Sequence, residues 1–297
     1  RDNIMRRREH AERGGTGVHL KKRFGQHMLK DQRILARIAG ECGLTGETTV
    51  LEIGAGTGNL TEELAQRAGR VISVEMDPQF QIYHTRLMMR YNNLEFIRSD
   101  ILDLDLDSME SLSKAGDLVI AGNIPYGITS PLIMKILEGN LPFRSIVFMV
   151  QKEMAERITA PPGSSDRSAF SLKVQYRADI ELLFKVPASA FIPPPRVDSA
   201  VIRFTLRRDK GLETGEEASF FRLLTAAFAQ KRKTLINSLG HGLKGAMSRE
   251  EVLEVLEGCG ISPGCRAETL NLIQFYDMYH AMSTKNPSFL QDKEKKS

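Results

Sequence analysis

The sequence predicts an α/β protein: a mostly parallel sheet that ends in an antiparallel pair, followed by a small all-helical domain. Three observations support this fold class. Short apolar runs alternate with helical patterns up to residue 158, two strand-like runs then follow with no helix between them, and the chain beyond Arg208 has only helical periodicity. Alternation of strand and helix is typical of parallel strands covered by helices on both faces. A chain of 297 residues is long enough for one large domain and a smaller one.

The parallel part of the sheet is predicted from five strands and five helices. Nearly continuous apolar runs predict strands at 48–54, 71–75, 94–100, 117–123 and 145–150. Apolar residues at helical spacing predict helices at 31–41, 59–69, 78–90, 130–139 and 152–158. Pro78 is a favoured first helical residue, and Ser130 is expected to cap the helix that it begins.

The sheet is expected to close with two antiparallel strands at 178–187 and 198–206, because the segment between them is too short for a comfortable parallel crossover. Helical patterns follow at 216–240, 248–260 and 267–282. We therefore expect four parts: a disordered basic tail at 1–18, an α/β domain at 19–208, a helical domain at 209–285 and a frayed tail at 286–297.

Composition is that of an ordinary soluble globular protein, with 41% hydrophobic and 26% charged residues. No apolar run approaches the roughly 18–20 residues of a membrane span, and the arginine-rich beginning lacks the apolar core of a secretory signal. The three cysteines, Cys42, Cys259 and Cys265, form no CxxC pair. A disulfide framework or a zinc site is therefore not expected, and a cytoplasmic protein is favoured.

Positive charge is concentrated in two segments. Residues 1–37 hold eleven Lys and Arg against four Asp and Glu, and residues 222–250 hold six basic residues and one acidic residue. Either segment alone could be a solvated face or a flexible tail. Because the rest of the chain is slightly acidic, the two segments together favour a polyanionic partner.

The segment LEIGAGTGNL places Gly54, Gly56 and Gly58 between a predicted strand and a predicted helix. Glycines at such a turn let a ligand approach the backbone, and the first N–H groups of the helix point outward. Asn59 stands where a dinucleotide-binding turn needs its third glycine, and an acid, Glu52, precedes the glycines in the strand. The loop therefore favours a ligand without a phosphate.

Carboxylates end the next two predicted strands, Glu75 the strand at 71–75 and Asp100 the strand at 94–100. In an open α/β sheet both side chains lie in the crevice at the carboxyl ends of the strands. Glu75 can there bind a ribose diol, and Asp100 can accept a hydrogen bond from the amine of an adenine. The alternative interpretations are a solvated acid for Glu75 and a helix cap for Asp100.

The fourth predicted strand ends in the tetrapeptide Asn123-Ile124-Pro125-Tyr126. With ExGxGxG at 52–58, this tetrapeptide resembles class I S-adenosylmethionine-dependent methyltransferases that modify an exocyclic amino nitrogen. KKRFGQHMLKD, FIPPPRVDSAVIRF and FAQKRKTLINSL extend the likeness, so that residues 20–282 resemble the ribosomal RNA adenine dimethyltransferases of the KsgA (RsmA) family. The resemblance implies a Rossmann-like, seven-stranded methyltransferase sheet, with an antiparallel end strand, at 19–208 and an RNA-binding helical domain at 209–285.

The resemblance also implies a reaction and its partners. We expect dimethylation of N6 of two adjacent adenosines in the 3′-terminal hairpin loop of 16S rRNA, within the small (30S) ribosomal subunit, by a monomer that needs no metal. The methyl donor implied is S-adenosyl-L-methionine, with cofactor contacts at His27, Leu29, Gly54, Gly56, Glu75, Asp100 and Asn123. The family signature is usually GQNFL, so His27 and Met28 depart from it. The His27 side chain can still form a hydrogen bond.

The chemistry of the substrate amine explains why residues 123–126 are expected to be catalytic. The N6 lone pair of adenine is delocalised into the ring, which makes the nitrogen a poor nucleophile. The amide oxygen of Asn123 and a backbone carbonyl within Ile124–Pro125 can accept its two N–H bonds and favour a pyramidal nitrogen, and the proline stiffens the turn. Tyr126 offers a face on which a flipped-out base can stack.

Contacts to RNA are expected at both basic segments and beside the adenine pocket. Two lysine- and arginine-rich triplets are assigned to the RNA phosphates: Lys21, Lys22 and Arg23 before the cofactor segment, and Lys231, Arg232 and Lys233 in the helical domain. The second triplet could instead only solvate a helix. Phe191 is expected to border the adenine pocket, or else to form a rigid corner with the prolines at 193–195.

Three other functions stay open. The nearest alternative is a methylase of 23S rRNA of the macrolide-resistance type, although FAQKRKTLINSL and PPPRVDS favour the small-subunit enzyme. A non-catalytic ribosome-assembly factor would not need the intact set of Gly54, Glu75, Asp100 and Asn123. A nicotinamide-dependent dehydrogenase is disfavoured by Asn59 and by the tetrapeptide.

Overall fold

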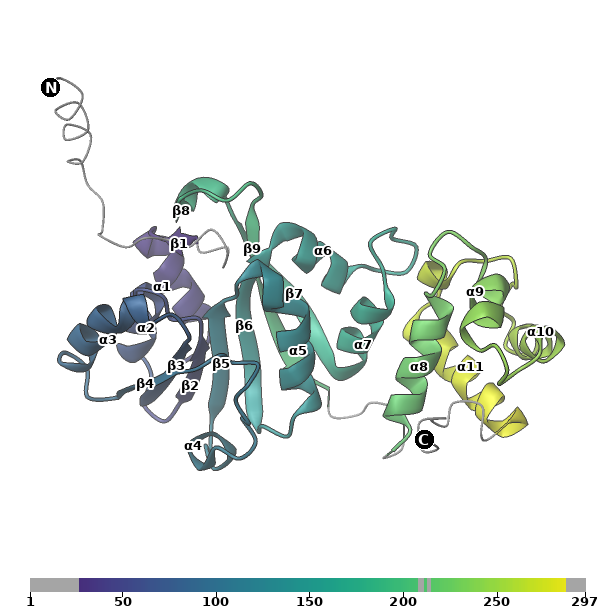
Figure 1. Cartoon of the computed structure of the whole chain (residues 1–297), viewed down its shortest axis with the longest axis horizontal. Coiled ribbons are helices and arrows are strands. Elements are labelled where there is room, and N and C mark those ends of the chain that lie inside the picture. The colour runs from purple at the N-terminus through teal and green to yellow at the C-terminus, as the bar shows by residue number, and fades with distance from the viewer. Residues whose placement is uncertain (1–26, 208–210, 213–214, 287–297) are drawn as a thin grey trace, which may run out of the picture.

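The computed structural model describes residues 27–207, 211–212 and 215–286. The tail predicted at 1–18 and nearly all of the tail predicted at 286–297 lie outside the described residues. The centre of the molecule is a seven-stranded sheet with the strand order β4-β3-β2-β5-β6-β9-β7 (Figure 1). Its strands are β2 Thr49–Ile53, β3 Arg70–Glu75, β4 Leu94–Arg98, β5 Leu118–Asn123, β6 Phe143–Gln151, β7 Ala178–Val186 and β9 Ser199–Leu206.

All seven predicted strands are present, and the predicted mixture of directions is confirmed. The five neighbouring strands β4, β3, β2, β5 and β6 pair in parallel. Strand β9 pairs antiparallel with both β6 and β7. The last strand of the chain, β9, therefore lies between β6 and β7, and β7 forms the edge. Burial on both faces holds for β2 and β5 but is wrong for β4, whose residues are half-buried or exposed because it forms the opposite edge.

Alternation along the buried strands divides the core into two layers. Leu51 faces one cluster, which includes residues of α5 Thr129–Glu138, α6 Lys152–Thr159 and α7 Ala169–Arg177. Its neighbour Val50 faces the other, which includes residues of α1 Gln32–Glu41 and α2 Asn59–Ala65. Side chains on a strand point alternately to opposite faces, so nearly continuous apolar strands feed both layers at once.

The helices around the sheet follow the predicted pattern with three differences. The segment at 78–90 begins as a 3₁₀ turn, Pro78–Phe80, before α3 Gln81–Met88. Ser130 does not cap α5, because the helix already begins at Thr129. The short α4 Glu110–Ser113 and the longer α7 were not predicted, although Ser168 and Ser171 form a reciprocal capping box at the start of α7.

A second, two-stranded sheet was also missed. Strand β1 Met28–Leu29 pairs antiparallel with β8 Phe191–Ile192, and Lys30 N–H donates to the Ala190 carbonyl at 3.1 Å. Strands of two residues carry no periodicity that a sequence pattern can reveal. This pairing brings residues from the two ends of the α/β domain together.

The helical domain lies beside α7, at the end of the sheet far from β4 (Figure 1). Its helices are α8 Glu217–Ala227, α9 Leu235–Gly242, α10 Arg249–Gly258 and α11 Leu272–Lys285. The predicted helical segment at 216–240 is broken into α8 and α9 by a turn at 228–234. None of the helices in the described part of the chain combines the length and the apolarity that a membrane crossing requires.

Helix α7 belongs to the cores on both sides of it. Val174 packs in a sheet cluster, whereas Leu172 and Tyr176 pack in the core of the helical domain. Arg177, 4% exposed, forms ion pairs with Glu138 of α5 and Glu217 of α8. The helical domain is therefore joined to the sheet by shared packing as well as by the chain.

A buried carboxyl group links three elements near the glycine turn. Glu52 of β2 is 1% exposed and accepts hydrogen bonds from the hydroxyls of Thr61 in α2 and Ser73 in β3, both at 2.5 Å. Burial raises the pKa of Glu52 to about 7, and the two hydroxyl bonds only partly oppose this. The acid that precedes the glycines therefore points into the core.

Replacing Tyr176 with Ala should lower the free energy of unfolding by about 3–4 kcal/mol, because it removes a buried aromatic ring. The Tyr176 ring centroid lies 5.4 Å from those of both Phe220 and Phe221. Urea denaturation measures the loss, and Tyr176→Phe, which keeps the ring, is the matched control. Equal losses in the two variants would contradict the assigned packing role.

Replacing Glu52 with Gln should change the pH dependence of stability. In the wild-type protein the unfolded state binds fewer protons than the folded state between the ordinary pKa of a glutamate and about 7, so stability falls as the pH rises through this window. Between about pH 5 and about pH 8, the free energy of unfolding of Glu52→Gln should therefore rise by about 2–3 kcal/mol relative to that of wild type. Glu95→Gln, at an exposed ion pair with Arg70, is the control. A pH-independent difference for Glu52→Gln would count against the buried acid.

Candidate functional site

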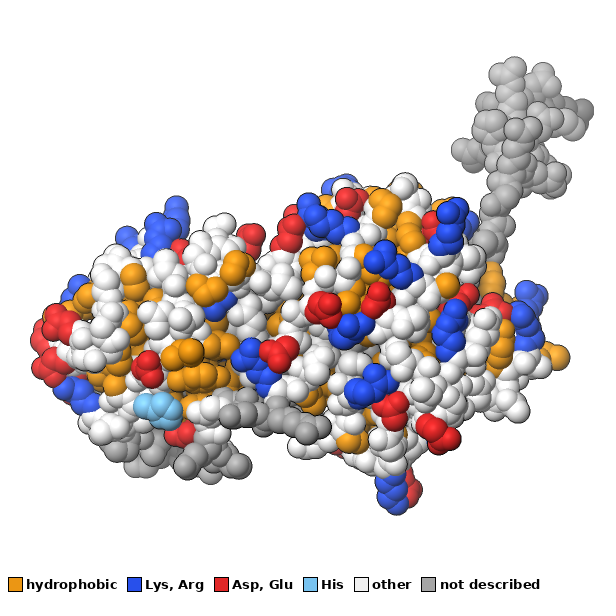
Figure 2. Space-filling model, turned by 180° about the vertical axis from the view of Figure 1, so that it is seen from behind, with side chains coloured by type: hydrophobic (Ala, Val, Ile, Leu, Met, Phe, Trp, Pro, Cys, Tyr) orange, Lys and Arg blue, Asp and Glu red, His pale blue; other side chains and the backbone are white. Residues whose placement is uncertain are grey.

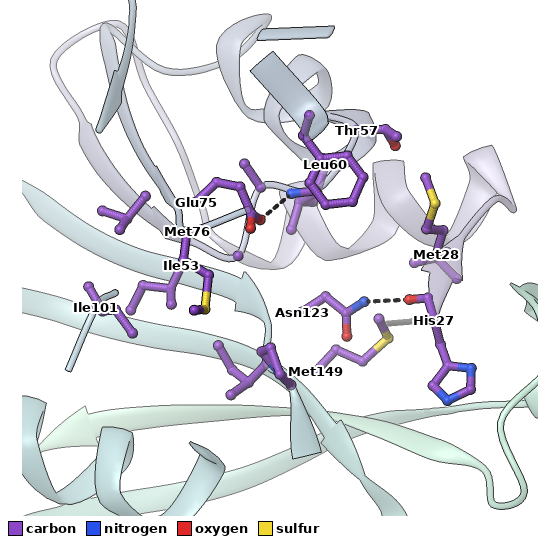
Figure 3. Close-up of a pocket in the computed structure, with 18 of the residues that line it drawn as sticks. His27, Met28, Ile53, Thr57, Leu60, Glu75, Met76, Ile101, Asn123 and Met149 are labelled. Carbon is purple, nitrogen blue, oxygen red and sulfur yellow. Dashed lines mark hydrogen bonds between the residues drawn. The ribbon is translucent and has the colours of Figure 1, made fainter. Parts of the chain in front are cut away.

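A cavity of about 360 Å³ opens at the carboxyl ends of β2, β3, β4 and β5 (Figure 3). The chain passes from β2 to β3 and β4 on one side and then returns to β5 on the other side of β2. The strand order thus reverses between β2 and β5, which is where open α/β sheets bind ligands. The lining includes every residue predicted to contact the cofactor or to be catalytic, together with Phe191: His27, Leu29, Gly54, Gly56, Glu75, Asp100, Asn123, Ile124, Pro125, Tyr126 and Phe191.

The glycine turn packs against the end of β5. Gly54, Gly56 and Gly58 all have positive φ, at 79°, 54° and 84°. A Cβ atom on Gly54 would lie 3.3 Å from the Asn123 carbonyl oxygen. A side chain at position 54 would therefore be both strained and crowded against β5. The other side of the turn is open to a ligand.

Asn59, which stands in place of a third glycine, has a structural function. It is the first residue of α2, and its side-chain Nδ2 donates to the Leu29 carbonyl at 3.1 Å. The departure from the dinucleotide pattern therefore anchors β1 next to the glycine turn. The sequence pattern gave no indication of this bond.

The Glu75 carboxylate lies in the pocket and is held by two backbone groups. Its Oε2 accepts from Gly56 N–H at 2.8 Å (Figure 3). Its Oε1 accepts from Asp77 N–H at 2.9 Å. Burial raises the pKa of Glu75, while both N–H bonds act in the opposite direction. Each oxygen keeps a lone pair for a ligand. Glu75 is therefore not simply a solvated acid, which was the alternative interpretation of its sequence position.

Asp100 follows β4 and also lines the pocket. Its Oδ1 accepts from Leu102 N–H at 2.9 Å, which closes a turn. The next helix, α4, begins only at Glu110, so Asp100 does not cap a helix. One carboxylate oxygen of Asp100 thus closes the turn, and the residue also borders the cavity.

The side chain of Asn123 is oriented by the N-terminal segment. Its Nδ2 donates to the His27 carbonyl at 3.4 Å, which assigns Oδ1 as the pocket-facing acceptor (Figure 3). The Pro125 carbonyl accepts from Ile128 N–H and from the Thr129 hydroxyl. Of the two backbone carbonyls considered from the sequence, that of Ile124 is therefore the better candidate for an acceptor.

The side chain of His27 turns toward Tyr126 and away from Asn123 (Figure 3). Its Nδ1–H donates to the Pro193 carbonyl at 2.8 Å, and its ring lies 5.8 Å from the Tyr126 ring at an interplanar angle of 27°. Burial raises the pKa of Tyr126. The imidazole thus ties the proline segment to the tyrosine, and the backbone of the same residue holds Asn123.

Sequence reasoning identified Phe191 but missed most of the apolar lining. Phe191 is 2% exposed and borders the cavity from β8. Met76 directly follows Glu75, and Ile101 directly follows Asp100. Both line the Glu75 side of the pocket (Figure 3). Their position immediately after Glu75 and Asp100 is the signal that could have revealed them.

Of the two basic triplets, the one at 231–233 does not line this cavity. Lys21, Lys22 and Arg23 lie outside the described residues. Lys231, Arg232 and Lys233 are exposed in the turn between α8 and α9, rather than on a helix as expected. Figure 1 shows this turn on the same edge of the molecule as β1 and β8, whereas on the back of the molecule basic and acidic side chains are interspersed (Figure 2).

Comparison with known proteins covers nearly the whole chain. A family model described as ribosomal RNA adenine dimethylase matches residues 17–283. The chain is 39% identical over 269 residues to ribosomal RNA small subunit methyltransferase A of Geobacillus thermodenitrificans, with coverage of 90% of this chain and 92% of the relative. It is 40% identical over 268 residues to the protein of the same name from Shouchella clausii, with 90% of each chain covered.

Two solved structures share the fold. A dimethyladenosine transferase from Plasmodium falciparum is 29% identical with a TM-score of 0.73, over 87% of this chain and 98% of that chain. The 23S rRNA methyltransferase ErmE is 26% identical with a TM-score of 0.67, over 86% and 99%. With a family model over residues 17–283 and relatives similar over nearly their full length, the chain belongs to the ribosomal RNA adenine dimethylase family of S-adenosylmethionine-dependent methyltransferases.

Proposed function

We propose that this chain dimethylates N6 of two adjacent adenosines in the 3′-terminal hairpin loop of 16S rRNA, in the small (30S) ribosomal subunit. The observation that carries the proposal is the position of the Asn123 amide oxygen. It faces a cavity whose opposite wall is a glycine turn and a backbone-held carboxylate. The names of the relatives from Geobacillus thermodenitrificans and Shouchella clausii support the small subunit as the source of the substrate.

The residues present fit S-adenosylmethionine. The cavity volume of about 360 Å³ is within the usual range for small ligands. Glu75 would bind the ribose diol and Asp100 the adenine amine, with Met76 and Ile101 against the ring. Gly54 and Gly56 would lie against the ligand through their backbone, in positive-φ conformations that residues with a side chain rarely adopt. Leu29, Asn123 and the backbone of His27 complete the proposed contacts.

The proposed mechanism is direct, in-line transfer to an adenine that has left its stack. The bound cofactor supplies an activated methyl group. Asn123 Oδ1 and the Ile124 carbonyl accept the two N6–H bonds and direct the nitrogen lone pair toward the methyl group. Pro125 fixes the turn, and Tyr126, braced by His27, stacks on the base. The product amine releases its proton to solvent.

The helical domain, divided from the methyltransferase domain near residue 208, is proposed to hold the RNA. Lys231, Arg232 and Lys233 would neutralise phosphates, with Lys21, Lys22 and Arg23 as a second contact. Phe191 would border the adenine. We further propose that the enzyme acts as a cytoplasmic monomer and uses no metal.

A second candidate function is methylation of large-subunit RNA, which the similarity to ErmE supports. Purified small subunits and 23S rRNA, each incubated with the protein and labelled cofactor, would separate the two functions. Mass spectrometry should find N6,N6-dimethyladenosine at two adjacent positions of 16S rRNA. Label in 23S rRNA alone would favour the second candidate, and label in neither would favour a non-catalytic assembly factor.

Replacing Asn123 with Ala should lower kcat about 100-fold and weaken cofactor binding far less, because it removes an acceptor that acts on the amine in the transition state. Single-turnover methylation and calorimetry with S-adenosylhomocysteine measure the two quantities. Asn140→Ala, in an exposed asparagine bonded to Asp107, is the control. An unchanged rate in Asn123→Ala would refute the assigned role.

Replacing Glu75 with Ala should weaken S-adenosylhomocysteine binding about tenfold or more, because charge-assisted hydrogen bonds to the ribose are lost. Glu75→Gln, which keeps one acceptor oxygen, should lose less. Glu95→Ala, on the exposed side of β4, should bind as wild type does. Calorimetry provides the dissociation constants, and equal affinity in Glu75→Ala and wild type would remove the ribose contact.

A further inference from the structure

His84 of α3 contacts the glycine turn from outside the pocket. The imidazole is 7% exposed, and its Nε2 lies 2.8 Å from the Gly56 carbonyl oxygen. Its ring lies flat against Phe96 of β4, with 4.1 Å between centroids and an interplanar angle of 4°. His84 is not among the residues that line the cavity. The hydrogen bond to Gly56 therefore gives His84 an indirect route to a ligand.

The hydrogen bond shows which nitrogen of the His84 ring carries a proton. A carbonyl oxygen can only accept, so Nε2 carries the proton. Burial lowers the pKa of His84, which favours the neutral ring near neutral pH. A neutral imidazole with its proton on Nε2 is therefore the form that donates to the turn.

The Gly56 peptide groups are held on both sides. Gly56 N–H donates to Glu75 Oε2 at 2.8 Å, and the Gly56 carbonyl accepts from His84. Gly56 has a φ of 54°, a conformation available chiefly to glycine, so the backbone alone constrains it weakly. One turn further along α3, Leu87 packs so closely on Gly58 that a Cβ atom there would lie 2.2 Å from Leu87 Cδ1. Helix α3 thus supports the turn at two points.

We propose that His84 is a positioning residue for cofactor binding, a role that rests on the proposed function. By holding the Gly56 carbonyl, His84 restricts rotation at Gly56 and so steadies the adjoining peptide group that carries the Gly56 N–H. That N–H in turn holds Glu75 Oε2 and sets the orientation of the carboxylate that receives the ribose. Phe96 of β4 packs against His84 of α3, and His84 donates to Gly56 of the glycine turn. Gly56 in turn donates to Glu75 of β3.

A purely structural role for His84 makes a different prediction. Packing against Phe96 requires a flat or apolar side chain of similar size and no N–H donor. A leucine would retain much of that packing and lose the bond to Gly56, whereas a glutamine can donate through its amide nitrogen. The two substitutions therefore separate the hydrogen bond from the packing.

The test compares His84→Leu, His84→Gln and Thr85→Ala in the full chain, by calorimetry with S-adenosylhomocysteine and by steady-state kinetics. The hydroxyl of Thr85, the control, donates along its own helix to the Gln81 carbonyl. His84→Leu should raise the dissociation constant and the KM for S-adenosylmethionine about three- to tenfold, as expected for one lost hydrogen bond. His84→Gln and Thr85→Ala should stay within about twofold of wild type, and kcat should change by less than about twofold in all three.

The outcomes distinguish this inference from the proposed function. A wild-type chain that binds no S-adenosylhomocysteine would overturn both. Wild-type affinity in His84→Leu would overturn the positioning role alone. So would equal weakening in His84→Leu and His84→Gln with a matching loss of thermal stability, because only packing would then connect His84 to the site.

Discussion

The close approach of β2 and β5 at their carboxyl ends is the constraint on which the rest of the site depends. A Cβ atom on Gly122 would lie 2.4 Å from the Ile53 carbonyl oxygen, and one on Gly54 would lie 3.3 Å from the Asn123 carbonyl oxygen. A glycine in β5 and another directly after β2 thus allow two backbones to meet where the strand order reverses. The proposed cofactor site at the glycine turn and the turn proposed to accept the amine are consequently neighbours, as a direct transfer between two bound molecules requires.

The N-terminal segment connects the two halves of the pocket. Asn59 bonds to the Leu29 carbonyl beside the glycine turn, and Asn123 bonds to the His27 carbonyl at the end of β5. Pairing of Leu29 with Phe191 fastens the same segment to the proline-rich connection before β9. Residues 27–29 therefore contact three distant parts of the chain.

Two glutamates near the glycine turn differ in function because their partners differ. Glu52 is enclosed among the hydroxyls of Thr61 and Ser73, and its raised pKa reflects a loss of hydration without a compensating charge. Glu75 is bound by two backbone N–H groups and faces the cavity. The first links β2, β3 and α2 through hydrogen bonds in the core, and the second is available to a ligand.

The sequence by itself determined the strands, the direction of the pairing and the residue types at each strand end. Apolar periodicity and strand-ending acids are local properties, so Glu75, Asp100 and Asn123 could be assigned to one edge without coordinates. Only the tertiary structure decided which groups hold them. The bond from Asn59 to Leu29, the β1–β8 pairing and the contact of His84 with Gly56 join residues far apart in sequence, and no local pattern encodes such contacts. The inward direction of Glu52 and the break between α8 and α9 were also decided there, because packing against other elements overrides a single strand or helix pattern.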